Sequence, residues 1–341
     1  MSAHAHFSSP ENALTVEAAR RALYLWLWAR REGGTFTVTP AAEVPQASGW
    51  REELRWLGLD WDAEAGAGES PAWLRSLPRL EECEPSPWGQ WSGRTAVAEL
   101  RTLGVLPEAL LHFLALSSWR PPEAARETLS RAELQALWSP EGLLAGPMRF
   151  DFELLRRINH AWLERADLDR LAELALPYYR RAGWLPPAFA GRDTLARPVR
   201  AWLRNLIRAV LPGLDFLSLL PPRTRLVFDY QPESYLRVPE SREAMEREGA
   251  REVVRAFGQR SLEESWLTGE RFRTILEEVK QETHWKGRNL HQPIRVMLTG
   301  LPFGPALDEL IPLIEQGAEL DLPAEIKSCR QRVLEFCSVF V

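Results

Sequence analysis

Apolar residues recur every three or four positions along most of this chain, the spacing that places them on one face of an α-helix. In the first such segment, Val16, Ala19, Leu23 and Leu27 share a face, and a pair of glycines follows. The same pattern predicts helices over residues 16–31, 50–61, 95–119, 131–138, 151–165, 168–182, 198–211, 241–257, 270–283 and 305–316.

Strand-like alternation of polar and apolar residues is confined to three short segments, 35–39, 223–230 and 295–298. Residues 63–92, rich in glycine, proline and tryptophan, show neither pattern and are predicted to form a connector. The expected fold class is therefore mainly α.

The composition is that of an ordinary globular protein, with 45% hydrophobic and 26% charged residues in 341. These values exclude disordered and collagen-like classes. Three cysteines are too few for a disulfide framework or a four-thiolate zinc site, so we expect no metal and a reducing, cytoplasmic location. We expect no signal peptide and no membrane span, because even the longest apolar stretch, 103–116, contains Glu108 and His112.

The net charge of -5 excludes a generally basic coat for nucleic acid. Among the 42 basic residues, 39 are arginines, and the lysines are Lys280, Lys286 and Lys327. Chemistry that needs a lysine to hold a phosphate or to form a Schiff base is therefore excluded from the first 279 residues.

One predicted helix carries a stripe of arginines at spacings of three and four, which we name the arginine row: Arg197, Arg200, Arg204 and Arg208. No Asp or Glu occurs between residues 194 and 214 to pair with them locally. The row is either a solvated helix face or a surface for RNA phosphates and stacked bases.

A second basic cluster contains Lys280, Lys286, Arg288 and Arg295, with His284 and His291 among them. It is either a contact for RNA or a charged surface loop in which Arg295 is buried in a structural ion pair. Most of the 15 tryptophans lie at helical core spacings, whereas Trp88 and Trp91 lie in the connector and are candidates for base stacking.

Several blocks, in chain order, resemble glutamyl-tRNA synthetase, a class I aminoacyl-tRNA synthetase. They are residues 19–23 (Ala-Arg-Arg-Ala-Leu), 54–62 (Leu-Arg-Trp-Leu-Gly-Leu-Asp-Trp-Asp), 104–111 (Gly-Val-Leu-Pro-Glu-Ala-Leu-Leu), 150–152, 158–160 and 286–300. The resemblance implies a Rossmann-like catalytic remnant (1–86), helices that contact the tRNA stem (87–167) and two helical anticodon-binding domains (168–235 and 236–341). The remnant is expected to be vestigial and truncated, because the 24 residues between Asp62 and Pro87 are too few for even one βαβ unit of about 30 residues. A sheet of one or two strands is expected to lack a crevice for ATP.

The two signatures of the family, which hold ATP, are degenerate here. The first, His-hydrophobic-Gly-Gly, aligns with Thr15, Val16, Glu17 and Ala18. The second, Lys-Leu-Ser-Lys-Arg, aligns with Pro87, Trp88, Gly89, Gln90 and Trp91. The carboxylate of Glu17 is expected to repel a phosphate at the start of a helix.

The resemblance therefore combines retained binding segments with degenerate catalytic ones. It predicts a protein that binds the glutamate-specific tRNA and does not form an aminoacyl-adenylate. No cofactor is expected. One alternative is a glutamate–tRNA ligase that uses ATP, its activity retained or completed by a partner chain. Another is a scaffold or regulator that contacts proteins and not RNA. The expected tRNA-binding residues are those of the arginine row with Lys280, Lys286, Arg288 and Arg295.

Overall fold

The computed structural model describes residues 3–9, 13–39, 49–64, 71–82, 87, 89–122, 128–146, 148–188 and 195–340. The chain divides into two compact units. Unit 1 contains Met1–Arg165 and Asp215–Ser218, and unit 2 contains Ala166–Leu214 and Leu219–Val341. The finer division into four domains stays a prediction.

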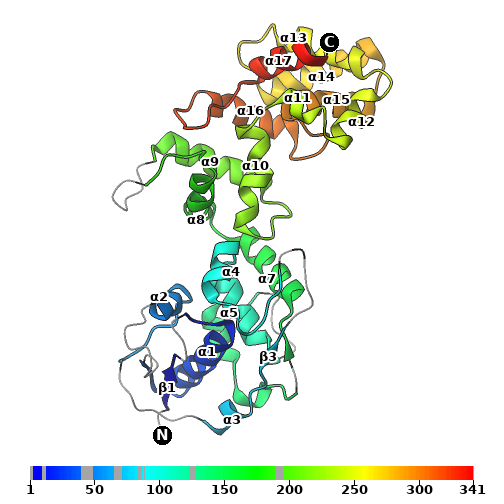
Figure 1. Cartoon of the computed structure of the whole chain (residues 1–341). Coiled ribbons are helices and arrows are strands. Elements are labelled where there is room, and N and C mark those ends of the chain that lie inside the picture. The colour runs from blue at the N-terminus through cyan, green and yellow to red at the C-terminus, as the bar shows by residue number, and fades with distance from the viewer. Residues whose placement is uncertain are drawn as a thin grey trace. The chain divides into compact units, whose positions relative to one another are not determined.

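Unit 1 combines short strands with helices (Figure 1). Its elements are β1 (His4–Ser8), α1 (Val16–Arg31), β2 (Thr35–Thr39), α2 (Gly49–Trp56), α3 (Ala72–Arg75), β3 (Leu80–Glu81), α4 (Val97–Leu103), α5 (Pro107–Leu116), α6 (Arg131–Leu137), η1 (Pro140–Gly142), β4 (Met148–Arg149) and α7 (Phe152–Arg165).

A parallel strand–helix–strand arrangement begins unit 1. β1 pairs with β2 in register, from His4 opposite Thr35 to Ser8 opposite Thr39. The inward side chains of both strands are buried where α1 packs against them. Elsewhere in the described chain, β3 and β4 form a parallel pair of two residues each. The predicted class, mainly α with a small Rossmann-like piece, is confirmed.

The helical part of unit 1 packs α5 between α1 and α7. Buried Asn159 of α7 holds the turn between α4 and α5, because its Oδ1 accepts the N–H of Leu106 at 2.8 Å. Its Nδ2 donates to the carbonyl of Asp215 at 2.6 Å, which fixes the segment Asp215–Ser218 on unit 1.

The described secondary-structure elements of unit 2 are helices, joined by turns and loops (Figure 1). Its helices are α8 (Leu168–Arg181), α9 (Arg197–Val210), α10 (Leu220–Phe228), α11 (Pro232–Tyr235), α12 (Pro239–Glu246), α13 (Ala250–Ser261), α14 (Gly269–Thr283), α15 (Arg288–Thr299), α16 (Leu307–Ala318) and α17 (Cys329–Phe340). The short turn η2 (Leu217–Leu219), before α10, begins in unit 1 and ends in unit 2. α9 packs against α8 and α16, and α13 packs against α14, α15 and α17.

Two predicted strands are helices. Residues 223–230 lie mostly in α10, which begins with prolines in its first turn, and residues 295–298 lie within α15. Both segments are short and apolar, so their periodicity does not separate strand from helix. β1 was not predicted, because it contains no β-branched residue and forms through its pairing with β2.

Two long predicted helices are each broken at a glycine. The helix expected over 95–119 divides into α4 and α5 at Gly104, whose φ is 95°, and Pro107 begins α5. The helix expected over 241–257 divides into α12 and α13 at Gly249, whose φ is 81°. Glycine adopts such left-handed conformations at little cost, which explains the positions of both breaks.

Candidate functional site

The arginine row lies on the face of α9 that is directed away from its apolar side. Pro198 stands in the first turn, and Val199, Leu203, Leu206 and Val210 are buried on the opposite side. Trp202 fixes the helix against α16 by donating its Nε1–H to the carbonyl of Leu313 at 2.7 Å. The hydrophobic side of α9 thereby anchors the helix and leaves the row at the surface.

Two arginines of the row have carboxylate partners on α8. Arg200 Nη1 lies 3.4 Å from Glu173 Oε1, and Arg204 Nη1 lies 3.3 Å from Asp169 Oδ1. The absence of acidic residues from 194–214 therefore does not leave Arg200 and Arg204 unpaired. The partners come from the neighbouring helix, about thirty residues earlier in the chain, which local sequence does not reveal.

The two arginines at the ends of the row are exposed. In the described part of the chain, no carboxylate lies within ion-pair distance of Arg197 or Arg208. Arg208 Nη2 donates to the amide oxygen of Asn205 at 3.1 Å, one turn earlier on α9. Both guanidinium groups are accessible to an anionic ligand.

The second basic cluster has members in different environments. Lys280 pairs with Glu277 at 2.8 Å along α14. Lys286 and Arg288 are exposed on either side of Gly287 at the start of α15, and neither has an ion-pair partner among the described residues. Only part of this cluster is available for a ligand.

Arg295 is half-buried in α15, and burial lowers its pKa. Its Nη1 has no hydrogen-bond partner among the described residues, and no ion pair to it is found there. The alternative expectation, that Arg295 is held in a structural ion pair, is wrong within that part of the chain.

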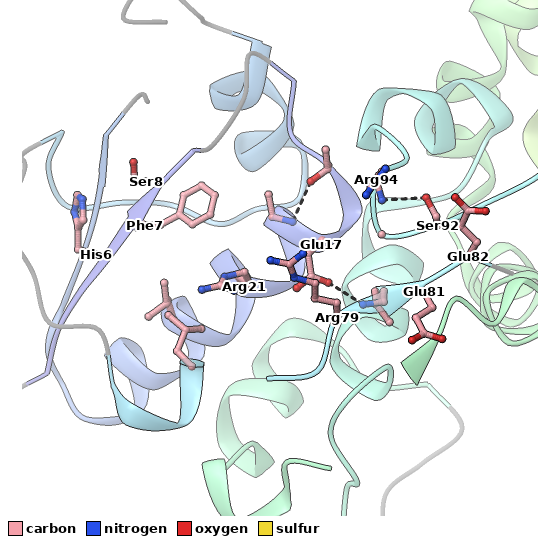
Figure 2. Close-up of a pocket in the computed structure, with 16 residues that line it drawn as sticks. His6, Phe7, Ser8, Glu17, Arg21, Arg79, Glu81, Glu82, Ser92 and Arg94 are labelled. Atoms are coloured by element: carbon pink, nitrogen blue, oxygen red, sulfur yellow. Dashed lines mark hydrogen bonds between the residues drawn. The ribbon is translucent and has the colours of Figure 1, made fainter. Parts of the chain in front are cut away.

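Unit 1 contains a pocket of about 770 Å³ at the start of α1 (Figure 2). Residues of β1, α1, β3 and the loops beside them line this pocket. The expectation that the two-stranded sheet lacks a crevice for ATP stays a prediction. The lining residues are His6, Phe7, Ser8, Thr15, Glu17, Ala18, Arg21, Leu25, Leu74, Arg79, Leu80, Glu81, Glu82, Ser92, Gly93 and Arg94.

The residues at the first degenerate signature are engaged within the protein. Thr15 Oγ1 accepts the N–H of Ala18 at 3.2 Å and so caps α1, while Val16 is buried. Glu17 pairs with Arg20 at 2.8 Å and accepts the N–H of Leu80 at 3.2 Å. Because Arg20 balances its charge, the carboxylate of Glu17 is a weaker repulsive element than the sequence suggested.

The second degenerate signature is partly a packing element. Trp91 is buried and stacks on Phe152 with ring centroids 5.5 Å apart, so its assignment as a free base-stacking residue is wrong. Gln90 donates to Glu82 at 2.9 Å, and Gly89 has a φ of 114°. Pro87 lies at a turn, whereas Trp88 lies outside the described residues.

The lining of the pocket carries charges of both signs. Three arginines line it, Arg21, Arg79 and Arg94, and no hydrogen bond or ion pair joins their guanidinium groups to a described residue. Three glutamates line the same pocket, and no lysine does. The mixed lining and the engaged start of α1 do not fit a nucleotide polyphosphate, which needs a cradle of cations and free backbone N–H groups.

Sequence reasoning did not find the α8 carboxylates or the contributions of Arg21 and Arg79 to the pocket. The three-residue spacing between Glu17 and Arg20 was a usable signal for the ion pair at the start of α1. Within the described residues, no three His, Cys, Asp or Glu side chains come together to hold a metal ion. None of the described helices has both the length and the apolar character needed to cross a membrane.

Comparisons with known proteins place these features in a family. Residues 170–319, which include the arginine row and the whole second cluster, match the family model for the anticodon binding domain. The chain is 32% identical over 222 residues to glutamate–tRNA ligase 1 of Caldicellulosiruptor saccharolyticus, covering 65% of this chain and 44% of the relative. It is 31% identical over 218 residues to the glutamate–tRNA ligase of Geobacillus stearothermophilus, covering 64% of this chain and 42% of that protein.

Two solved structures share the fold. A glutamate–tRNA ligase from Elizabethkingia meningosepticum superimposes with a TM-score of 0.66 at 12% identity, with 100% of both chains covered. The glutamate–tRNA synthetase of Elizabethkingia anophelis gives a TM-score of 0.69 at 11% identity, covering 99% of this chain and 100% of that one. The chain spans less than half the length of the curated relatives that it matches. It is a relative of the glutamyl-tRNA synthetases, with an anticodon binding domain match over residues 170–319.

Proposed function

We propose that this protein binds tRNA through unit 2, with the arginine row as its main phosphate-contacting surface. The observation that carries the proposal is the alignment of four arginines on the solvent side of α9, inside the segment that matches an anticodon binding domain. Guanidinium groups bind phosphates and stack on exposed bases. Lys286 and Arg288 supply further exposed cations in the same matched segment.

The preferred RNA in this proposal is tRNA specific for glutamate, because the matching relatives are glutamate–tRNA ligases. We propose further that the chain does not form an aminoacyl-adenylate and uses no cofactor. Thr15 and Glu17 support this view, since both side chains are engaged in structural contacts where the resembling enzymes carry their first signature.

Charge reversal tests the proposed surface. The triple variant Arg200→Glu, Arg204→Glu and Arg208→Glu is expected to lose at least ten-fold in affinity for tRNA, because three favourable phosphate contacts become repulsive. A matched triple variant with glutamine at the same positions removes the contacts to phosphate without adding negative charge. It therefore separates the loss of these contacts from the repulsion between the new glutamates and the α8 carboxylates. Unchanged affinity in both variants would rule out the arginine row as the binding surface.

A second candidate function is glutamate–tRNA ligation with ATP, retained by this chain or completed by a partner chain. The pocket of about 770 Å³ favours keeping this candidate, since its volume suits a small molecule such as glutamate and three arginines line it. The nucleotide polyphosphate, which this lining does not fit, would then need residues of a partner chain. Glutamate-dependent exchange between ATP and pyrophosphate, measured with the chain alone and with candidate partners, would establish this activity. Its absence in every combination would remove the candidate.

A further inference from the structure

Two ion pairs between α8 and α9 form a regular ladder. Asp169 faces Arg204 and Glu173 faces Arg200, so a step of four residues up one helix matches a step of four down the other. The two helices are therefore antiparallel, and the carboxylates lie beside the two middle arginines of the row.

These pairs lie in solvent. The side chains of Asp169 and Glu173 are 74% and 69% exposed, and those of Arg204 and Arg200 are 36% and 37% exposed. Pairs so exposed stabilise a fold very little. Their larger effect is on a ligand, because a phosphate that approaches either arginine must displace a carboxylate and then stay close to it.

The ladder does not reach the ends of the row. Its register places the buried Leu176 opposite Arg197, and α8 begins at Leu168, too late to place a residue opposite Arg208. The arginine row therefore has two open ends and a blocked middle.

We infer that Asp169 and Glu173 act as a built-in competitor that weakens binding of polyanions to the middle of the arginine row. The inference rests on the proposed binding of RNA by this surface. A ligand that offers only negative charge gains contacts at Arg197 and Arg208 and meets repulsion between them. An RNA whose shape supplies other contacts displaces the carboxylates. Asp169 and Glu173 thus increase the selectivity of the arginine row for a structured RNA and lower its affinity for RNA in general.

The double variant Asp169→Asn with Glu173→Gln tests this role, since it removes both charges and keeps the side-chain shapes. A matched control is Glu263→Gln with Glu270→Gln, which removes two exposed charges from unit 2 near the α13–α14 turn. Dissociation constants for a tRNA transcript and for poly(U) RNA are measured by fluorescence anisotropy at several salt concentrations.

The double variant is expected to bind tRNA about three- to ten-fold more tightly than the control variant. The slope of log affinity against log salt should steepen by about one, because the freed arginines neutralise a further RNA phosphate and release the cations condensed on it. Affinity for poly(U) should rise by a larger factor, so that selectivity for tRNA falls.

The outcomes separate this inference from the proposed function. If the wild type binds tRNA and the double variant behaves like the control, the competitor role is wrong and the binding function stands. If neither the wild type nor the double variant binds tRNA, both proposals are overturned.

Discussion

Nη2 of Arg20 lies 2.8 Å from both carboxylate oxygens of Glu17, one turn earlier on α1. The Arg20 side chain is fully buried and also donates to Ser118 Oγ and to the carbonyl of Pro78. Glu17 is thus the counter-ion of a buried cation, at the position where the resembling enzymes keep a glycine to approach ATP. The residue at this position therefore has a structural role.

We expect Glu17→Gln to reduce the free energy of unfolding by about 2–3 kcal/mol, because it leaves the buried guanidinium of Arg20 without its counter-ion. Urea-induced unfolding measures the change. The control is Glu82→Gln, an exposed carboxylate of the same pocket. Equal stability of the two variants would show that the ion pair is not structural.

His112 provides a prediction for pH. It is buried in α5, its Nδ1 has no hydrogen-bond partner among the described residues, and burial lowers its pKa to about 4 from 6.5. The unfolded chain therefore takes up a proton at this histidine before the folded chain does. The free energy of unfolding should fall between about pH 6.5 and pH 4, by up to about 3 kcal/mol, and this contribution should be constant above pH 7.

Urea unfolding at pH 7 and pH 5 checks this dependence. His112→Leu should remove much of the decrease, whereas His291→Leu, which changes an exposed histidine, should leave it unchanged. A wild-type decrease that persists fully in His112→Leu would assign the effect to other groups.

Arg332 joins three segments of unit 2. Fully buried in α17, it donates to the carbonyls of Leu226 at 2.7 Å, Val227 at 2.6 Å and Leu298 at 2.9 Å. Arg332→Met leaves three buried carbonyls without donors and should lower the free energy of unfolding by about 3 kcal/mol or more. Arg330→Met, at an exposed neighbour on the same helix, should cost less than about 1 kcal/mol in the same urea titration.

The sequence was sufficient for features that depend on local pattern. Helix α9, its buried face and the alignment of its arginines follow from spacings of three and four within one segment. The cap of α1 also depends only on local sequence, because the hydroxyl of Thr15 accepts the N–H of Ala18, three residues later.

Features that depend on contacts between distant segments were missed. Asp169 and Glu173 reach the arginine row only because α8 packs beside α9, and the pocket forms only because Leu80 and Arg94 approach the start of α1. The strand β1 was missed for the same reason, because its pairing with β2 lies outside the segment. The helix α10 was predicted as a strand because its short apolar run does not distinguish strand from helix.

The central claim is that this chain binds tRNA, and retention from a total RNA pool tests it most directly. Purified wild-type protein is incubated with the pool, separated by native electrophoresis, and the bound RNA is sequenced, with the arginine-row triple glutamate variant in parallel. The wild type should retain tRNA enriched in the glutamate-specific species, and the variant should retain little. No enrichment of tRNA by the wild type over the variant would contradict this claim.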